Sequence, residues 1–168
     1  MKTSTFACIM IAAVSYFGIS VAVANAQTIA RTPPPAASGR LVARTIDLIP
    51  IPSRIAHGVV SVRNIGTSAS LPSVVTVNCH RPNQEGGCAD IPAAYLAQYT
   101  DAAYPNRLVV QVPAIQPGHV YNHTLPWFAG AGWTSGQTYE FDFVADAGAA
   151  NNESNEANNT GSHSWVAP

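Results

Sequence analysis

The feature that most constrains the fold is an alternation of apolar and polar residues over Thr138 to Asp146, which only Val144 interrupts. The alternating residues are Tyr139, Phe141, Phe143 and Ala145 on one side, and Glu140, Asp142 and Asp146 on the other. Successive side chains of a strand point to opposite faces of its sheet. The segment therefore predicts a half-buried β-strand, with Asp146 on the solvent face.

Other short runs show the same period or an enrichment in β-branched residues, and Pro, Gly or Asn residues separate them. We expect further strands over Leu41–Leu48, Ile55–Asn64, Pro72–His80, Arg107–Val112, Val120–Trp127 and Thr160–Val166. The sequence contains no convincing amphipathic helix of ordinary length. About seven short strands predict an all-β fold, an immunoglobulin-like β-sandwich.

The start of the chain has the pattern of a secretory signal peptide. Lys2 precedes a largely apolar run from Phe6 to Val23, and Ala24-Asn25-Ala26 forms a small-x-small cleavage site. Polar residues interrupt the run, which is shorter than the roughly 20 apolar residues of a spanning helix. We therefore expect a signal peptide over 1–26, cleaved after Ala26, instead of a retained anchor. The product would be secreted or periplasmic.

A proline-rich leader follows the expected cleavage site. Residues 27–39 include the run TPPPAASG, whose three prolines lack an N–H and favour an extended chain. One domain is expected over 40–168, since the remaining chain is long enough for a single core.

The charged residues of the expected mature chain argue against a nucleic-acid partner. After Ala26 the sequence has no lysine and seven arginines, against nine carboxylates. Such a chain offers no basic surface for phosphates, so nucleic acid is not an expected partner. No later stretch is apolar enough to span a bilayer.

Two cysteines remain once Cys8 leaves with the signal peptide. Cys79 and Cys88 form an even pair in an oxidising compartment, and we expect them to be bonded. The alternative is a zinc site, which needs more nitrogen and sulfur ligands, and only His80 is adjacent. A closed loop of this size stabilises by roughly 2 to 3 kcal/mol in the chain-entropy model.

An insertion at about 81–106 lies between two expected strands and lacks their alternating pattern. It contains most of the cysteine loop, followed by Ala, Leu and Tyr residues at loosely helical spacing, which predict a helical turn or two. Long loops on a rigid scaffold often carry binding. A glycan-binding surface would need exposed aromatic side chains, and the candidates are Tyr95, Tyr99, Tyr104 and Trp133.

Three stretches resemble the CARDB family of bacterial cell-adhesion-related domains: VVSVRNIGTSAS, AIQPGHVYNHTLPW and TYEFDFVADAGAANNESNEANNT. The third is the most specific, because Tyr139–Asp146 and Glu153–Thr160 fill the positions of the family's strand and its Glu-Ser-Asn-Glu-x-Asn-Asn-Thr run. The resemblance covers roughly Leu41 to Val166 without the insertion. It implies a seven-stranded sandwich of exported proteins, commonly an accessory or adhesion-type module, and no catalytic residues. The chain departs from the family pattern at Ala147-Gly148-Ala149 and in its disulfide-bearing insertion.

Oxygen-bearing side chains crowd the connection between the last two expected strands. Calcium takes roughly six to eight oxygen ligands, so a calcium site is one hypothesis for this connection. Asn residues also tolerate left-handed backbone and bond to nearby main-chain groups, as a tight connection requires. We favour this structural role without a metal, and assign it to Asp146, Glu153, Asn155, Glu156, Asn158 and Asn159.

The histidines give no indication of a metal site. His119 and His123 would share one face of a strand at about 13 Å along the chain, too far apart for one metal. We expect His123 to be partly buried.

The sequence contains no hydrolase or metallopeptidase motif. We therefore expect no enzyme and no cofactor, but a secreted binding or adhesion-type module whose partner is an exported protein or a glycan. The alternatives are a structural or inhibitor-like partner of another exported protein, and a calcium-stabilised accessory domain.

Overall fold

The computed structural model describes residues 43–82 and 88–168. The expected signal peptide, the leader and the first residues of the expected domain lie outside the described residues. The strands are β1 (Leu48–Pro50), β2 (Val59–Asn64), β3 (Ser73–His80), β4 (Leu108–Val112), β5 (Val120–Thr124), β6 (Thr138–Val144) and β7 (Thr160–Val166). The helical segments are η1 (Pro52–His57), η2 (Ala93–Tyr95), α1 (Leu96–Tyr99), η3 (Phe128–Gly130) and η4 (Glu156–Asn158).

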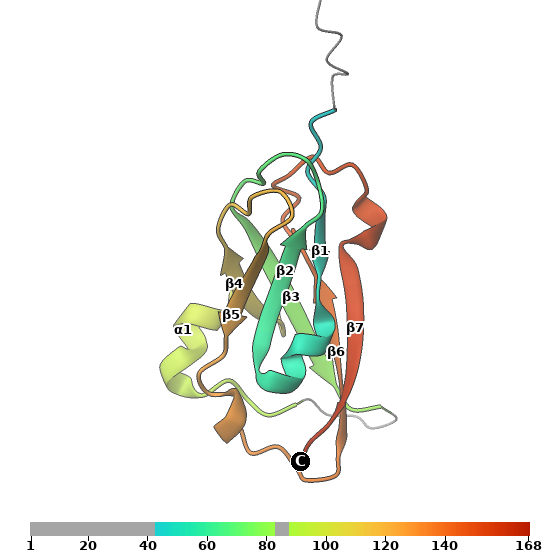
Figure 1. Cartoon of the computed structure of the whole chain (residues 1–168). Helices are drawn as coiled ribbons and strands as arrows, with labels where there is room; N and C mark the ends of the chain where they lie inside the picture. Colours follow the sequence, from blue (N-terminus) through green and yellow to red (C-terminus); the bar gives the residue numbers. More distant parts are fainter. Residues whose placement is uncertain (1–42, 83–87) are drawn as a thin grey trace, which may run out of the picture. The chain divides into compact units, whose positions relative to one another are not determined.

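The strands form two antiparallel sheets that pack face to face (Figure 1). One sheet has the order β1-β2-β5 and the other the order β4-β3-β6-β7. Strands distant in sequence therefore pair, as β2 with β5 and β3 with β6. This is the immunoglobulin-like sandwich that the alternation predicts.

The core lies between the sheets and confirms the alternation in β6. Tyr139, Phe141 and Phe143 are buried, and Val60 and Val62 of β2 belong to the same core cluster. Burial of such side chains contributes roughly 1.5 to 3 kcal/mol each, so this cluster is the main source of stability.

Asp146 is buried, so the prediction that it faces solvent is wrong. The backbone leaves the extended conformation here, with φ of 46° at Asp146. The Asp146 carboxylate turns back over its own connection and accepts the amides of Ala150 and Asn151 at 3.1 and 2.8 Å. An Asp side chain that bonds to a nearby main chain stabilises this left-handed backbone.

Three of the expected strands differ from the observed ones by several residues. The strand expected over Leu41–Leu48 begins only at Leu48, and Ile46 makes an isolated bridge with Glu153. The first three residues of the strand expected over Ile55–Asn64 belong to the 3₁₀ helix η1, which Pro52 begins without needing a hydrogen-bond acceptor. Gly58 ends it at φ of 67° against Phe128, where a Cβ would lie 2.8 Å from the Phe128 Cβ.

The strand expected over Val120–Trp127 ends at Thr124. Beyond it the chain turns into η3. The Leu125 amide donates to the carbonyl of Gly58, and the Phe128 amide donates back to the carbonyl of Leu125. Trp127 and Phe128 therefore lie in a turn and not in the sheet.

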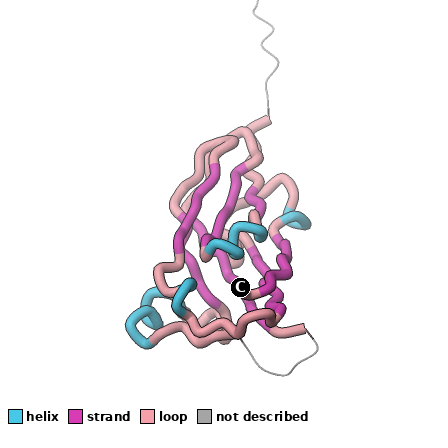
Figure 2. The backbone as a smooth tube through the Cα atoms, turned by 60° about the horizontal axis from the view of Figure 1, so that its bottom comes forward, coloured by secondary structure: helices cyan, strands magenta, loops and turns pink. Residues whose placement is uncertain are grey.

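The segment between β3 and β4 contains η2 and α1, which confirms a helical turn or two. Figure 2 shows that the helical segments lie in the connections between strands. The disulfide Cys79–Cys88, with a Cα–Cα distance of 5.7 Å, joins this segment to β3. Among the described residues, no helix is long and apolar enough to cross a membrane.

Candidate functional site

Opposite ends of the sandwich hold the residues that the sequence marks as candidates (Figure 1). The insertion end consists of residues 88–107 and 125–133, and includes α1. The turn end consists of residues 45–48 and the β6–β7 connection, 145–159, and includes η4. The two ends differ in chemistry.

A cavity of about 930 Å³ opens at the insertion end. The sandwich contributes mainly apolar walls, from Ile55, Leu125, Trp127, Phe128, Trp133 and Phe141. The insertion contributes Ile91, Leu96 and Tyr104 together with the charged residues Asp90, Asp101 and Arg107. A concave, mostly apolar space with a few polar groups is the usual form of a binding site.

A second cavity of about 720 Å³ lies beside the first and shares Leu125, Phe128 and Trp133 with it. The rings of Phe128 and Trp133 pack at 4.9 Å between centroids, and the Trp133 indole donates to the Phe128 carbonyl at 2.6 Å. Trp165 packs against both rings at 5.3 Å. These aromatic contacts fix the wall between the cavities.

Tyr99 is a core residue. It is 2% exposed, and its hydroxyl hydrogen-bonds to Nε2 of His123 at 2.9 Å. Its ring packs on Trp127 at 6.3 Å between centroids. Burial raises the pKa of Tyr99 and lowers the pKa of His123, which is partly buried as expected. Tyr99 therefore anchors α1 to β5 and offers no free face to a sugar.

The other aromatic candidates lie in different places. Tyr104 and Trp133 both line the larger cavity. Tyr95 is half-buried and packs against Tyr99 at 6.2 Å between ring centroids. Sequence reasoning missed Trp127 and Phe128, because a strand was expected to run through them.

Trp127 has a polar atom without a partner. Its indole nitrogen is buried and has no hydrogen-bond partner among the described residues. Buried donors are almost always paired in proteins, so this atom is an exception in the cavity wall, and with almost no accessible surface it does not face the open space.

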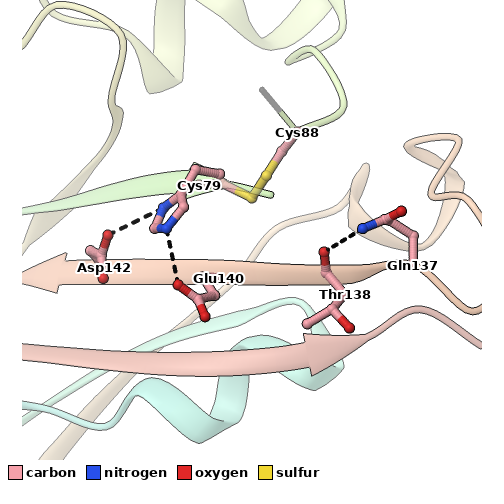
Figure 3. A network of polar contacts seen from close by, with 7 residues as sticks. Cys79, Cys88, Gln137, Thr138, Glu140 and Asp142 are labelled. Carbon is pink, nitrogen blue, oxygen red and sulfur yellow. Dashed lines mark hydrogen bonds and ion pairs between the residues drawn. A yellow bond between two sulfur atoms is a disulfide. The ribbon is translucent and has the colours of Figure 1, made fainter. Parts of the chain in front are cut away.

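The disulfide stands at the rim of the larger cavity, since Cys79 and Cys88 both line it. Figure 3 shows Glu140 and Asp142 of β6 close to this bond. His80, the residue after Cys79, lies between their carboxylates, at 3.0 Å from Glu140 and 3.4 Å from Asp142. These contacts and the disulfide hold the start of the insertion to the sheet.

Side-chain hydrogen bonds fill the turn end. Asn155 caps η4 by accepting the Ala157 amide at 3.1 Å. Glu156 accepts the Glu153 amide at 3.2 Å, and Asn159 donates to Glu156 at 2.9 Å. The polar side chains thus satisfy part of the hydrogen bonding of their own connection.

The same connection also holds the beginning of the described domain. The Ser154 amide donates to the carbonyl of Ile46 at 2.8 Å, and Asn158 donates to the Asp47 carboxylate at 2.8 Å. The Leu48 amide donates to the Glu153 carboxylate. No local pattern in the sequence indicates these partners, because more than 100 residues separate each pair.

Glu153 is the most perturbed carboxyl group of this end. It is 8% exposed, and burial raises its pKa to about 7. The Leu48 amide opposes this shift, while the negative charges of Asp146, Glu156 and Asp47 add to it. Within residues 43–82 and 88–168, no group of three or more His, Cys, Asp or Glu side chains is arranged to hold a metal ion.

Comparisons with known proteins bear on the family. The CARDB family model matches residues 52–163. Among solved structures, the chain is similar to the CARDB domain of a Pyrococcus furiosus protein, crystallised in complex with di-metal ions. The two share 17% identity with a TM-score of 0.34, and the match covers 76% of this chain and 99% of the other. No curated protein matches the chain. Since the family model spans about two thirds of the sequence, the chain belongs to the CARDB family.

Proposed function

We propose that the domain is a non-enzymatic binding module of an exported protein, and that its insertion end takes apolar side chains of a partner protein. The observation that carries this proposal is the cavity of about 930 Å³ between the insertion and the sandwich. Both of its sides present apolar side chains. The signal-peptide pattern and the disulfide support export, since disulfides persist in oxidising compartments.

A protein partner fits this cavity better than a glycan does. Sugars stack on open aromatic faces, whereas Tyr99 is buried and the rings of Phe128 and Trp133 pack against each other. The aliphatic residues Ile91 and Leu96 of the insertion suit apolar side chains instead. Glycan binding is the competing outcome of the test.

The test uses a substitution at the cavity rim and a matched control at the other end of the sandwich. Leu96 lines the cavity and is 44% exposed, while Leu71 lies in the β2–β3 connection and is 57% exposed. Both side chains are partly exposed, so Leu96→Asp and Leu71→Asp should both fold, and the melting temperature of each variant checks this. The secreted chain and both variants are compared in pull-downs from exported proteins and on a glycan array.

We expect a protein partner whose affinity falls at least about tenfold, or roughly 1.4 kcal/mol, with Leu96→Asp and stays unchanged with Leu71→Asp. Equal capture by all three chains would contradict the placement of the site. Binding to glycans alone, with the same sensitivity to Leu96→Asp, would keep the site and reject the protein partner.

A further inference from the structure

The two sheets have four edge strands, and three of them are protected. β1 is only three residues long and ends in Pro50. The helix η1 packs so closely on β7 that a Cβ on Gly161 would lie 2.8 Å from Cγ of Pro52, and α1 packs against β4. Short strands, prolines and covering helices are common protections of edge strands, because an open edge pairs with other chains. The fourth edge strand, β5, contains no proline, lysine, arginine or carboxylate.

The main-chain groups of β5 alternate between its neighbour and the open side. The Leu125 amide donates to the carbonyl of Gly58 at 2.8 Å, and the Asn64 amide donates to the carbonyl of His119 at 3.1 Å. These bonds lie just beyond the two ends of the β2–β5 pairing, so odd-numbered residues of β5 bond to β2. The N–H and C=O groups that point away from β2, toward the free edge in Figure 1, belong to Val120, Asn122 and Thr124, which are all exposed.

Donor groups surround the middle of this edge. Arg54 of η1 donates to Oδ1 of Asn122 at 2.9 Å, and the Ser61 hydroxyl of β2 donates to the same oxygen at 2.7 Å. A guanidinium group only donates, so this atom is the carboxamide oxygen, and the N–H groups of Asn122 remain for another acceptor. Arg54 is exposed and makes no ion pair within residues 43–82 and 88–168. The edge therefore has an unbalanced positive charge beside Asn122.

We propose that β5 is a docking edge: an extended segment of a partner protein adds to it as an antiparallel fourth strand, with an acidic side chain opposite Asn122 and next to Arg54. In this mode of recognition, main-chain hydrogen bonds give affinity, and the side chains of alternate residues give specificity. The docking edge is separate from the cavity of the insertion end, and neither proposal depends on the other.

The geometry of strand addition sets the sequence of the partner segment. Residues directly opposite each other in a hydrogen-bonded antiparallel pair have Cα atoms roughly 5.5 Å apart. A carboxylate opposite Asn122 is therefore within reach of the Arg54 guanidinium, which itself bonds to Asn122. The residues two positions before and after the carboxylate lie opposite Thr124 and Val120, where β-branched side chains pair well. A matching segment has a β-branched, an acidic and a β-branched residue at alternate positions.

A second copy of this chain is the competing occupant. Two β5 strands that pair through their outward groups, centred on the same residue, place Asn122 opposite Asn122. This arrangement brings no carboxylate to Arg54, whereas an acidic segment balances its charge. The charge at the edge thus favours a different protein.

Peptides of defined sequence and the secreted chain test the proposal. The peptide Thr-Thr-Val-Thr-Glu-Thr-Val-Thr-Thr has the proposed alternation, and the same peptide with lysine in place of glutamate is the matched control. We expect the glutamate peptide to bind at least about fivefold more tightly in an NMR titration, because opposite charges attract across strands and like charges repel. The glutamate peptide should also slow hydrogen exchange at the amides of Val120, Asn122 and Thr124, which point to the added strand.

Two variants separate the main-chain bonds from the charge. Thr124→Pro removes one outward N–H, at a position where an edge strand tolerates proline, and should weaken both peptides at least about tenfold. Arg54→Gln should abolish the preference for glutamate. Arg44→Gln is the control for the lost charge, since exposed Arg44 precedes β1 on the far side of β2, and it should keep the preference. If Thr124→Pro does not fold, the Arg54→Gln comparison decides alone.

Four results would overturn the proposal. The glutamate peptide does not bind, or it binds the natural chain no better than the lysine peptide. Hydrogen exchange slows only around α1, which would place the peptide in the cavity. Arg54→Gln keeps the full preference for glutamate. Sedimentation shows that the chain alone forms a dimer in which Val120, Asn122 and Thr124 are protected, which would assign the docking edge to a second copy.

Discussion

The two ends of the sandwich join distant parts of the chain in different ways. At the turn end, hydrogen bonds from Glu153, Ser154 and Asn158 connect to residues more than 100 positions away. At the insertion end, the side-chain bonds of Thr100 and Asp101 reach only four and two positions. The contacts that fix the insertion to the sandwich include its disulfide, Tyr99, and Tyr104, whose hydroxyl lies close to Gly148 of the β6–β7 connection. One scaffold thus has an end closed by non-local polar contacts and an end that stays open around a cavity.

Among the changes that test this difference, removing the Tyr99 side chain should lower the free energy of unfolding the most. Tyr99→Ala deletes a buried ring and leaves Nε2 of His123 without its partner, which should lower the free energy of unfolding by about 3 to 5 kcal/mol. Urea unfolding measures the change. Tyr95→Ala is the control, because Tyr95 is only half-buried. An equal loss in both variants would mean that Tyr99 is no special anchor.

Loss of the disulfide should cause the next largest decrease in the free energy of unfolding. Replacing Cys79 and Cys88 by serine should lower the free energy of unfolding by about 2 to 3 kcal/mol without preventing folding, because the core cluster between the sheets is unchanged. Thermal unfolding with and without reductant measures this. If the reduced chain does not fold, the insertion contributes more to the sandwich than the structure indicates.

The alternation in β6 could be predicted from the sequence because one face of this strand meets the core, and the span expected for β7 is the one observed. The helix η1 could not, since the apolar residues of its segment are also typical of a strand and the effect of Pro52 is local. The burial of Asp146 depends on a positive φ that the alternation does not reveal. The cavity and the contacts of Glu153 form only when distant segments meet.

Substitutions at the turn end should cause a smaller decrease in the free energy of unfolding. Replacing Asn158 and Asn159 together by alanine removes donors to Asp47 and Glu156, and should cost about 1 to 3 kcal/mol of unfolding free energy. Asn152→Ala is the matched control, since Asn152 lies exposed in the same connection. The structural role of the turn would be refuted by a double variant as stable as this control.

Native-state hydrogen exchange at about pH 6 tests most directly whether one end is closed and the other open. At the turn end, the amides of Leu48 and Asn151 bond to buried carboxylates and should exchange as slowly as the β3 and β6 core. At the insertion end, the amides of Thr100 and Ala103 bond only within the insertion and should exchange through local opening, at least about tenfold faster. Equal protection at the two ends would contradict the account.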